Sequence, residues 1–479
     1  MTAGTNRTDR AGRAGQPRDT AAGPPRPGGM AQYALLAGPL LSMLDSSIVN
    51  VAVEPITRDL HASLTTVQWT VSGYLLALGA GLAGTAYLAR RFGTLPVYRA
   101  SVIAFTLASA GCALSPGAGV LVAARAVQGL TAAPMVPLAM SMLLGGEADA
   151  AAIPPLAGIM LFLGPALGPT VGGALIGTVG WRAIFLINVP LGALAVVAIR
   201  FIPAALAPGR TPGARFDLPG LILLAAGLTG LLLGSSQGGS AGWAAASTWA
   251  PLAAGTVLLA CYARWAARSA QPALDLSLAR QRVPALSMTL CALAAVVTWG
   301  AVFLLPVFVQ SVQGRSALAA GLAMAPQGLV TGLSTALAPR FLTRLSIRVT
   351  VLAGFALLGL ASLGLLSVSA ATPLWLIALI LAGRSFSIGL VINPLLQAMT
   401  QPLLPGQLGD ANTLFNAWNR VAGSFGIGLI AALYTTQARS AGPVLALHTV
   451  GIVLTVIALA GALAATALPA TRNIALRRR

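Results

Sequence analysis

Apolar runs of about 20 residues recur along this chain from Ala31 to Leu468 and leave room for little else. A helix of that length crosses the hydrocarbon core of a bilayer, which is about 30 Å thick. Because backbone groups in lipid must be hydrogen-bonded internally, we expect these runs to be helices. The sequence therefore predicts an all-α membrane protein without a soluble domain of useful size.

Fourteen spans can be counted between short polar segments. Arginine tests this count, because basic residues concentrate in loops on the cytoplasmic side of a membrane. Twenty-two arginines fall in, or within a few residues of, alternate connecting segments, and four fall in the opposite set. A miscount by one helix would destroy this alternation, so the pattern predicts an even number of spans and two cytoplasmic termini. The spans run over residues 31–53, 68–89, 97–115, 119–143, 153–177, 184–202, 217–236, 249–267, 283–309, 317–339, 349–369, 373–397, 412–436 and 444–468.

The net charge is +19, and all of the 29 basic residues are arginine. This charge is not gathered on a folded surface, so we do not expect nucleic acid as a partner. The three cysteines lie in or near apolar runs without ligand spacing, which predicts no metal site. Residues 1–30 form a polar tail rich in Arg, Pro and Gly, for which we expect disorder on the cytoplasmic side. Residues 469–479 form a second, basic cytoplasmic tail.

Asp45 is the one carboxylate that lies well inside an apolar run. A charged group at that depth costs about 2.5–3.5 kcal/mol on insertion scales and usually faces a polar cavity. A lone protonatable acid in a many-pass protein points to proton coupling. The alternative is a structural acid bonded to a polar neighbour, and the residue alone leaves both interpretations open.

Three arginines, Arg125, Arg384 and Arg420, also lie well inside spans. Arg125 and Asp45 lie at similar depths below the same membrane surface, because a helix rises 1.5 Å per residue. We hypothesise that they are linked directly or through water; a static ion pair is the alternative to a proton site. The arginine would favour the ionised acid and burial the neutral acid, and these opposing effects would permit proton exchange. For Arg420 we expect snorkelling toward the surface, and for Arg384 either pairing across a cavity or bonds to backbone carbonyls.

Four segments carry a family resemblance: LDSSIVNVA at residues 44–52, RAVQG at 125–129, GPALGPTVGG at 164–173 and WRAIFLINVPLG at 181–192. Together they resemble the major facilitator superfamily, specifically its fourteen-span drug:proton antiporters, over about Ala31 to Leu468. The resemblance implies the major facilitator fold, with two six-helix bundles and two extra helices. The implied domains are an N-terminal bundle at 31–202, a linker with the extra transmembrane helices at 203–282 and a C-terminal bundle at 283–468.

Gly164, Gly168 and Gly172 recur every four residues, so they form a bare stripe along one helix face. Such a stripe predicts close approach of a neighbouring helix. The resemblance implies more for this segment, which includes Pro169 and Gly173: in the family it helps to seal one side of the transporter and marks exchangers. Generic tight packing is the alternative.

Arg90, Arg91 and Gly93 lie in the connector between the second and third spans, which the resemblance identifies as a gating loop. Family members carry an aspartate where this chain has Arg90. In the family that acid helps to latch the two halves in the outward-open state. The opposite charge here predicts a changed gate.

We therefore expect a proton-coupled exporter of small amphipathic organic compounds, such as antibiotics, that works by alternating access in the cytoplasmic membrane. The expected driving force is the proton gradient, without a cofactor, and the expected partners are a small-molecule substrate, protons and the lipid bilayer, with the protein as a monomer. The alternatives are export of an endogenous metabolite, peptide or lipid-like compound, and a channel. An intramembrane enzyme would need a catalytic cluster, and the chain has no HExxH motif and only two histidines, both near the ends of spans. The candidate cavity residues lie within spans and are aromatic, amide or charged: Tyr74, Gln128, Trp299, Phe303, Arg384, Asn393, Asn416 and Trp418.

Overall fold

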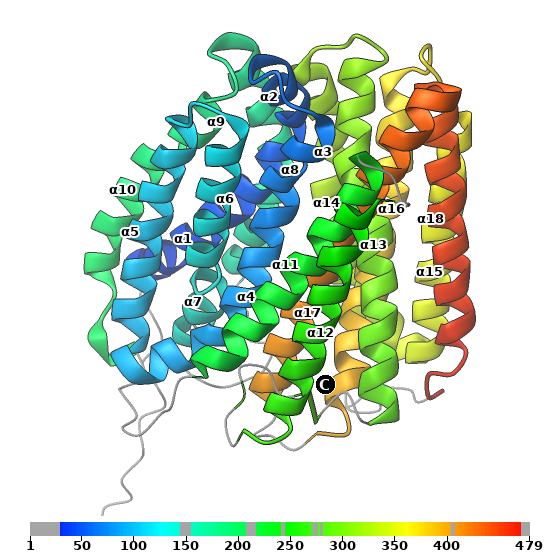
Figure 1. Ribbon diagram of the computed structural model, residues 1–479. Helices are drawn as coiled ribbons and strands as arrows, with labels where there is room; N and C mark the ends of the chain where they lie inside the picture. The colour runs from blue at the N-terminus through cyan, green and yellow to red at the C-terminus, as the bar shows by residue number, and fades with distance from the viewer. Residues whose placement is uncertain are drawn as a thin grey trace, which may run out of the picture.

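The computed structural model describes residues 29–143, 155–206, 217–240, 245–269, 272, 276–277, 281–403 and 408–470. Both predicted tails, apart from their innermost residues, and the segment 144–154 lie outside the described residues. All regular elements within the described ranges are helices, and they run roughly parallel or antiparallel to one another (Figure 1). This agrees with the predicted all-α fold.

The first group of helices comprises α1 to α10. Helix α1 packs against α7, α8 and α10, while α6 packs against α4 and α5. The group consists of α1 (Gly29–Ile48), α2 (Val53–Asp59), α3 (Leu64–Val67), α4 (Trp69–Phe92), α5 (Thr94–Ala113), α6 (Ala118–Ala132), α7 (Met135–Leu143), α8 (Pro155–Thr178), α9 (Ala183–Leu186) and α10 (Asn188–Ala198).

The second group comprises α13 to α18. Helix α13 packs against α16, α17 and α18, and α14 and α15 both pack against α16. The group consists of α13 (Arg282–Ser311), α14 (Ala317–Arg344), α15 (Ile347–Leu363), α16 (Leu374–Thr400), α17 (Leu408–Ala441) and α18 (Pro443–Ala465).

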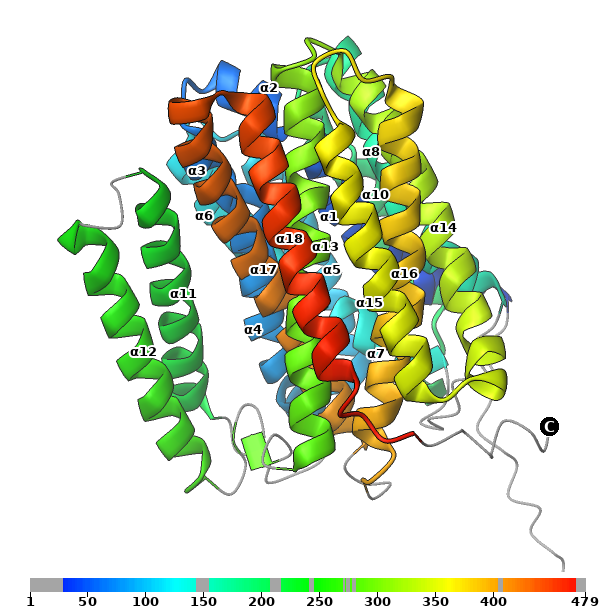
Figure 2. The ribbon, with the colours of Figure 1, turned by 90° about the vertical axis from the view of Figure 1, so that its right-hand side faces the viewer.

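Helices α11 (Leu218–Ser240) and α12 (Ala246–Ala266) pack on each other and stand at one edge of the molecule (Figure 2). Helix α11 attaches this pair to the rest through α17 and α4. The domain boundaries remain a prediction, but the packing partners are those that two bundles with an added pair would have.

Thirteen of the described helical stretches are long and apolar enough to cross a membrane. Helix α8, with 24 residues, occupies the place of the fifth predicted span. Several predicted spans are not single helices. Pro134 separates α6 from α7, because proline has no backbone N–H to continue a helix. The sixth predicted span is likewise divided into α9 and α10.

We call the end of the molecule that carries α2, α3 and α9 the distal end, and the opposite end, where the described chain begins and finishes, the terminal end (Figure 1). At the distal end, Asp59 accepts hydrogen bonds from the indole of Trp181 at 2.8 Å and from Arg182 at 2.9 Å. These two bonds, first that of Trp181, lower the pKa of Asp59 below its usual range. They join α2 to the segment that precedes α9.

The two groups of helices meet tightly in their distal halves. Ser424 on α17 donates a hydrogen bond to the carbonyl of Ser72 on α4 at 2.8 Å. Gln310 near the distal end of α13 donates to the carbonyl of Val51 at 3.0 Å. Helices α8 and α14 also approach closely, and a Cβ on Gly321 would collide with the carbonyl of Pro169. These contacts close the distal side between the groups.

Candidate functional site

Asp45 on α1 and Arg125 on α6 form an ion pair inside the first group of helices. Arg125 Nη1 lies 2.6 Å from Asp45 Oδ2, and both side chains are fully buried. Of the two forms of contact that the matching depths suggested, the structure has the direct one. Because the pair lies within spanning helices, it is screened from bulk water and its bonds are strong.

The two carboxylate oxygens of Asp45 have different partners. Oδ2 accepts from Arg125, whereas Oδ1 accepts from Gln128 Nε2 at 3.1 Å and from Asn188 Nδ2 at 2.8 Å. Asn188 in turn reaches Ser109 Oγ at 3.0 Å. Sequence reasoning did not select Asn188, although it lies within the WRAIFLINVPLG segment and is an amide at the start of an apolar helix.

Arg125 is held by more than its acid. Its Nε donates to the carbonyl of Thr70 at 2.8 Å, its Nη1 also donates to Gln128 Oε1 at 2.7 Å, and its guanidinium carbon lies 4.1 Å from the ring centre of Tyr74. Within the described residues, Nη2 has no hydrogen-bond partner. The structure thus places Tyr74 and Gln128, both predicted as cavity residues, directly around the ion pair.

Glycine allows α4 and α6 to approach closely enough for this arrangement. A Cβ on Gly129, four residues beyond Arg125, would collide with the carbonyl of Tyr74. Within one and a half turns of helix, the RAVQG segment therefore supplies the charged Arg125, the amide of Gln128 and, at Gly129, the space into which the backbone of α4 fits.

The glycine stripe of α8 lies against α1, next to the ion pair. Added Cβ atoms on Gly164 and Gly172 would meet α1 at 3.0 and 2.5 Å, and one on Gly168 would collide with Ser47 Oγ. The hydroxyl of Ser47 donates to the carbonyl of Gly164 at 3.1 Å. The predicted close helix approach is therefore present.

The remaining residues of this segment face the second group. A Cβ on Gly173 would lie 2.5 Å from the carbonyl of Ala317 on α14. Pro169 presents its carbonyl to Gly321, as described above. Helix α8 is thus pressed between α1 on one face and α14 on the other.

The predicted gating loop is shorter than expected. Arg90 and Arg91 belong to the last turn of α4, where both are exposed, and α5 begins directly after Gly93. Gly93 has a φ of 95°, which side chains rarely tolerate. A single glycine therefore makes the turn at the terminal end, and the two arginines lie beside it.

The candidate cavity residues of the second group do not gather in one place. Phe303 is fully buried in the core. Arg384 is also buried and donates to Ser362 Oγ at 2.8 Å and to the carbonyl of Val297, which corresponds to the carbonyl-bonded alternative. Asn393 on α16 is partly exposed, and Asn416 on α17 is exposed.

Arg420 on α17 does not snorkel to the surface. Its guanidinium carbon lies 5.5 Å from the ring centre of Trp299 on α13, so the side chain stays among the helices. It is partly exposed, and the described residues offer it no ion pair. Sequence reasoning identified the charge within the span but not the direction of the side chain.

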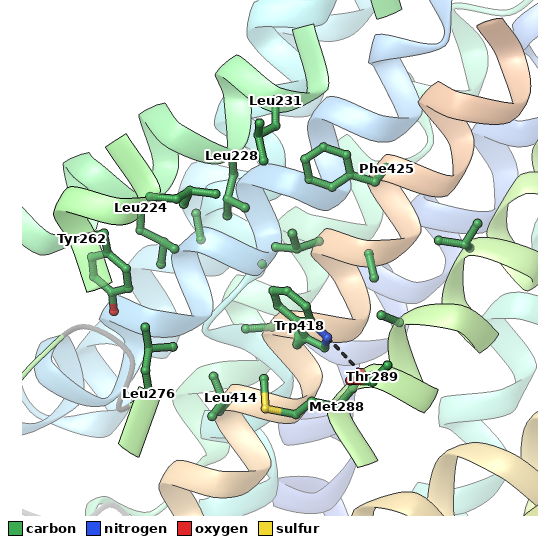
Figure 3. A pocket seen from close by; sticks show the side chains of 18 of the residues that line it. Leu224, Leu228, Leu231, Tyr262, Leu276, Met288, Thr289, Leu414, Trp418 and Phe425 are labelled. Carbon is green, nitrogen blue, oxygen red and sulfur yellow. Dashed lines mark hydrogen bonds between the residues drawn. The ribbon is translucent and has the colours of Figure 1, made fainter. Parts of the chain in front are cut away.

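Trp418 lines a lateral cavity between the α11–α12 pair and α4, α13 and α17 (Figure 3). The cavity has a volume of about 660 Å³ and almost entirely apolar walls, including Leu228, Tyr262 and Phe425. The indole of Trp418 donates to the carbonyl of Met288 at 3.0 Å, as the dashed line shows. Trp418 therefore borders a space on the outer side of α17.

Among the side chains that the structure describes, no three His, Cys, Asp or Glu residues come together as metal ligands would. The site is instead a buried acid–arginine pair fixed by two amides, inside a bundle of spanning helices. Ionisable groups at this depth typically belong to ion or substrate pathways. Fold and site together define the class of polytopic membrane transporters.

Comparison with known sequences specifies the family. The sequence pattern of the Major Facilitator Superfamily matches residues 35–427, and the chain belongs to this family. It is 32% identical over 408 residues to a Mycobacterium tuberculosis protein named multidrug resistance protein B homolog, covering 83% of this chain and 74% of that one. It is 29% identical to the multidrug export protein EmrB of Escherichia coli over 84% of this chain and 80% of that one. The methylenomycin A resistance protein of Streptomyces coelicolor is 29% identical, with 89% and 90% covered.

Solved structures agree with the fold. A peptide transporter named POT in complex with sulfate superposes with a TM-score of 0.67 at 17% identity, over 94% of this chain and 97% of that one. An auto-inhibited member of the POT family gives a TM-score of 0.68 at 15% identity, over 92% and 98%. At these identities the likeness supports the major facilitator fold alone.

Proposed function

We propose that this protein exports small amphipathic organic compounds, including antibiotics, across the cytoplasmic membrane in exchange for protons. The observation that carries the proposal is the buried Asp45–Arg125 pair within spanning helices. The drug-resistance names of relatives at about 30% identity support the substrate class. The alternation of arginine-rich segments supports an orientation with the terminal end in the cytoplasm.

The unequal partners of the Asp45 oxygens suggest where the proton binds. A proton on Oδ2 would neutralise the acid and displace Arg125 Nη1, while Gln128 and Asn188 would still hold Oδ1. The carboxyl group therefore keeps its position in both protonation states. Protonation of Asp45 would therefore move Arg125 and not the carboxyl group.

Arg125 is connected to the contact between the two groups of helices. It binds the carbonyl of Thr70 on α4, and two residues further along α4 the carbonyl of Ser72 accepts the hydrogen bond from Ser424. Displacement of Arg125 would therefore alter α4 at the point where α4 meets α17. This is a short physical route from proton binding to the distal closure, and it fits rocking of the two groups by alternating access.

The test uses the purified full-length protein in liposomes with an imposed proton gradient. We expect gradient-driven transport of an amphipathic dye that collapses when an uncoupler is added, and loss of this transport in Asp45→Asn. Transport that persists with the uncoupler would indicate a channel. Full proton-driven transport by Asp45→Asn would refute the role of the acid.

The orientation has its own test. A fluorescent protein fused to the C-terminus should fluoresce and an alkaline phosphatase fused there should be inactive, because both report cytoplasmic location. The reverse result would place the terminal end outside and would reverse the direction of transport that we propose.

A further inference from the structure

The interior of the protein carries positive charge that none of the acids with a described side chain balances. Of these acids, Asp45 is bonded to Arg125, Glu54 and Asp59 lie at the distal end, and Asp217 lies at the start of α11. Apart from Arg125, two arginines lie well inside the described spanning helices, away from their ends. Arg384 is buried among neutral groups, and Arg420 lies over an indole ring.

Arg420 ends a polar stripe on one face of α17. Asn412, Asn416 and Arg420 are spaced four residues apart and therefore lie above one another on the helix. Trp418 is two residues from Asn416 and two from Arg420, so it lies on the opposite face, where it borders the lateral cavity. The polar stripe thus faces away from that cavity.

The neighbours of α17 show that this face is directed toward the middle of the protein. On one side of the stripe, Arg420 meets α4, because a Cβ on Gly79 would lie 3.4 Å from the Cβ of Arg420. On the other side, Arg420 meets Trp299 of α13. The stripe therefore lies between the first and second groups of helices.

The exposure along the stripe indicates a space that water reaches. Asn412 and Asn416 are exposed and Arg420 is partly exposed, although all three belong to a spanning helix. Amides and a cation would not be left facing hydrocarbon at that depth. Since the groups are closed at the distal end, the space opens toward the terminal end.

A cation in such a space attracts an anion, and the planar guanidinium group of Arg420 determines which anions fit it well. Guanidinium binds the planar or tetrahedral oxygens of carboxylate, sulfonate or phosphate through paired N–H groups. Trp299 adds an aromatic face, and Asn416 adds a further hydrogen-bonding group one turn toward the terminal end. A permanent cation would be repelled by Arg420 and by the charge of Arg384.

We infer that this space binds organic anions with an aromatic body, and that Arg420 holds the acidic group. The inference rests on the proposed function, of which it specifies the substrate class. It is compatible with proton exchange, because the residues that would hold the anion are not those that bind Asp45. Export of an anion in exchange for an entering proton also moves two charges in the same sense, so an interior-negative membrane potential would drive it twice over.

The binding test compares two xanthene dyes of similar size, anionic fluorescein and cationic rhodamine 123, by equilibrium dialysis against the purified full-length protein. We expect fluorescein to bind about tenfold or more tightly than rhodamine 123. Arg420→Gln should weaken fluorescein binding by about 10- to 100-fold, the range for a hydrogen bond to a charged group, and leave rhodamine 123 unweakened.

Two further variants separate the charge from general effects. Arg420→Lys keeps the charge but loses the paired N–H groups, so it should bind fluorescein more tightly than Arg420→Gln and less tightly than the unchanged protein. Its binding also shows that position 420 tolerates substitution. Arg344→Gln removes one exposed positive charge at the end of α14 and should leave binding unchanged. Equal binding of the two dyes, or a loss of less than twofold in Arg420→Gln, would overturn the inference.

Transport in liposomes distinguishes this inference from the proposed function. If a proton gradient drives rhodamine 123 but fluorescein neither binds nor moves, the anion inference is overturned and the exporter remains. If fluorescein binds through Arg420 but no gradient moves either dye, the anion site remains and proton-coupled export is overturned.

Discussion

Replacement of Asp45 by asparagine separates the structural contribution of the ion pair from its proposed part in proton transfer. Asparagine keeps one carbonyl oxygen for the amides of Gln128 and Asn188, so those two bonds survive. Arg125 loses its only charged partner and already has one nitrogen without a hydrogen bond in the described structure. Breaking a buried pair on one side costs about 3–5 kcal/mol, a large part of a typical total of about 5–15 kcal/mol.

The size of this effect can be measured by thermal unfolding of the purified protein. Because each kcal/mol of lost unfolding free energy lowers the melting temperature by about 2–4 °C, the melting temperature of Asp45→Asn should fall by roughly 6–20 °C. Arg125→Met should destabilise similarly, because it leaves the carboxylate without its cation. The double variant should lose less than the sum of the two, with a coupling energy of about 2 kcal/mol, since neither charge is then left alone.

Transport then gives an independent readout. The double variant should be folded yet unable to use a proton gradient, because no acid remains to carry the proton. If the double variant is as stable as expected and still couples export to the gradient, the reasoning about Asp45 is wrong. If the two destabilisations simply add, Asp45 and Arg125 stabilise the fold independently and not as the ion pair that their 2.6 Å contact indicates.

Three further predictions concern other parts of the molecule. Gly321→Val should reduce transport about tenfold or more, because overpacking against the carbonyl of Pro169 costs about 1–3 kcal/mol in the closed state, whereas Gly111→Ala, with open space around it, should transport normally. Gly93→Ala should lower stability by about 1–2 kcal/mol in thermal unfolding, because its φ of 95° disfavours side chains. Asp59→Asn should lower the melting temperature slightly at pH 7 but not in strong acid. Because the pKa of Asp59 is lowered in the folded protein, its ionised carboxylate stabilises the fold at pH values above the usual aspartate range. This stabilisation is lost as the pH falls through the lowered pKa. Equal melting temperatures at pH 7 would contradict this.

The order of the helices and the depth of the charges could be predicted from the sequence, because both depend on distance along the chain. Hydrophobic length identifies a span, and the rise per residue places Asp45 and Arg125 at the same level. The glycine stripe of α8 was predictable for the same reason, since spacing by four fixes a shared face. These properties do not depend on which helix becomes the neighbour.

The contacts across helices could not be predicted, because they depend on how each helix is rotated. Asn188 reaches Asp45 only because α10 turns its first residue inward beside α1. Arg420 is directed at Trp299, although its position in the span equally suited a side chain that extends to the surface. The single-glycine turn at Gly93 was also missed, because apolar length does not reveal that the polar Arg90 and Arg91 continue the helix.

The distal closure is built from contacts that are individually weak, which matters for the proposed exchange. It consists of close packing between α8 and α14 and of neutral hydrogen bonds such as that of Ser424, each worth about 0.5–1.5 kcal/mol net. A shift from 1:99 to 99:1 between two conformations requires about 5.5 kcal/mol of differential binding. Leaving one partner of a buried ion pair without its counter-charge costs about 3–5 kcal/mol, which is of this order. A closure held by a buried salt bridge between the groups would resist that amount, whereas glycine and serine at this contact would allow one proton on Asp45 to change the balance, as the proposed exchange requires.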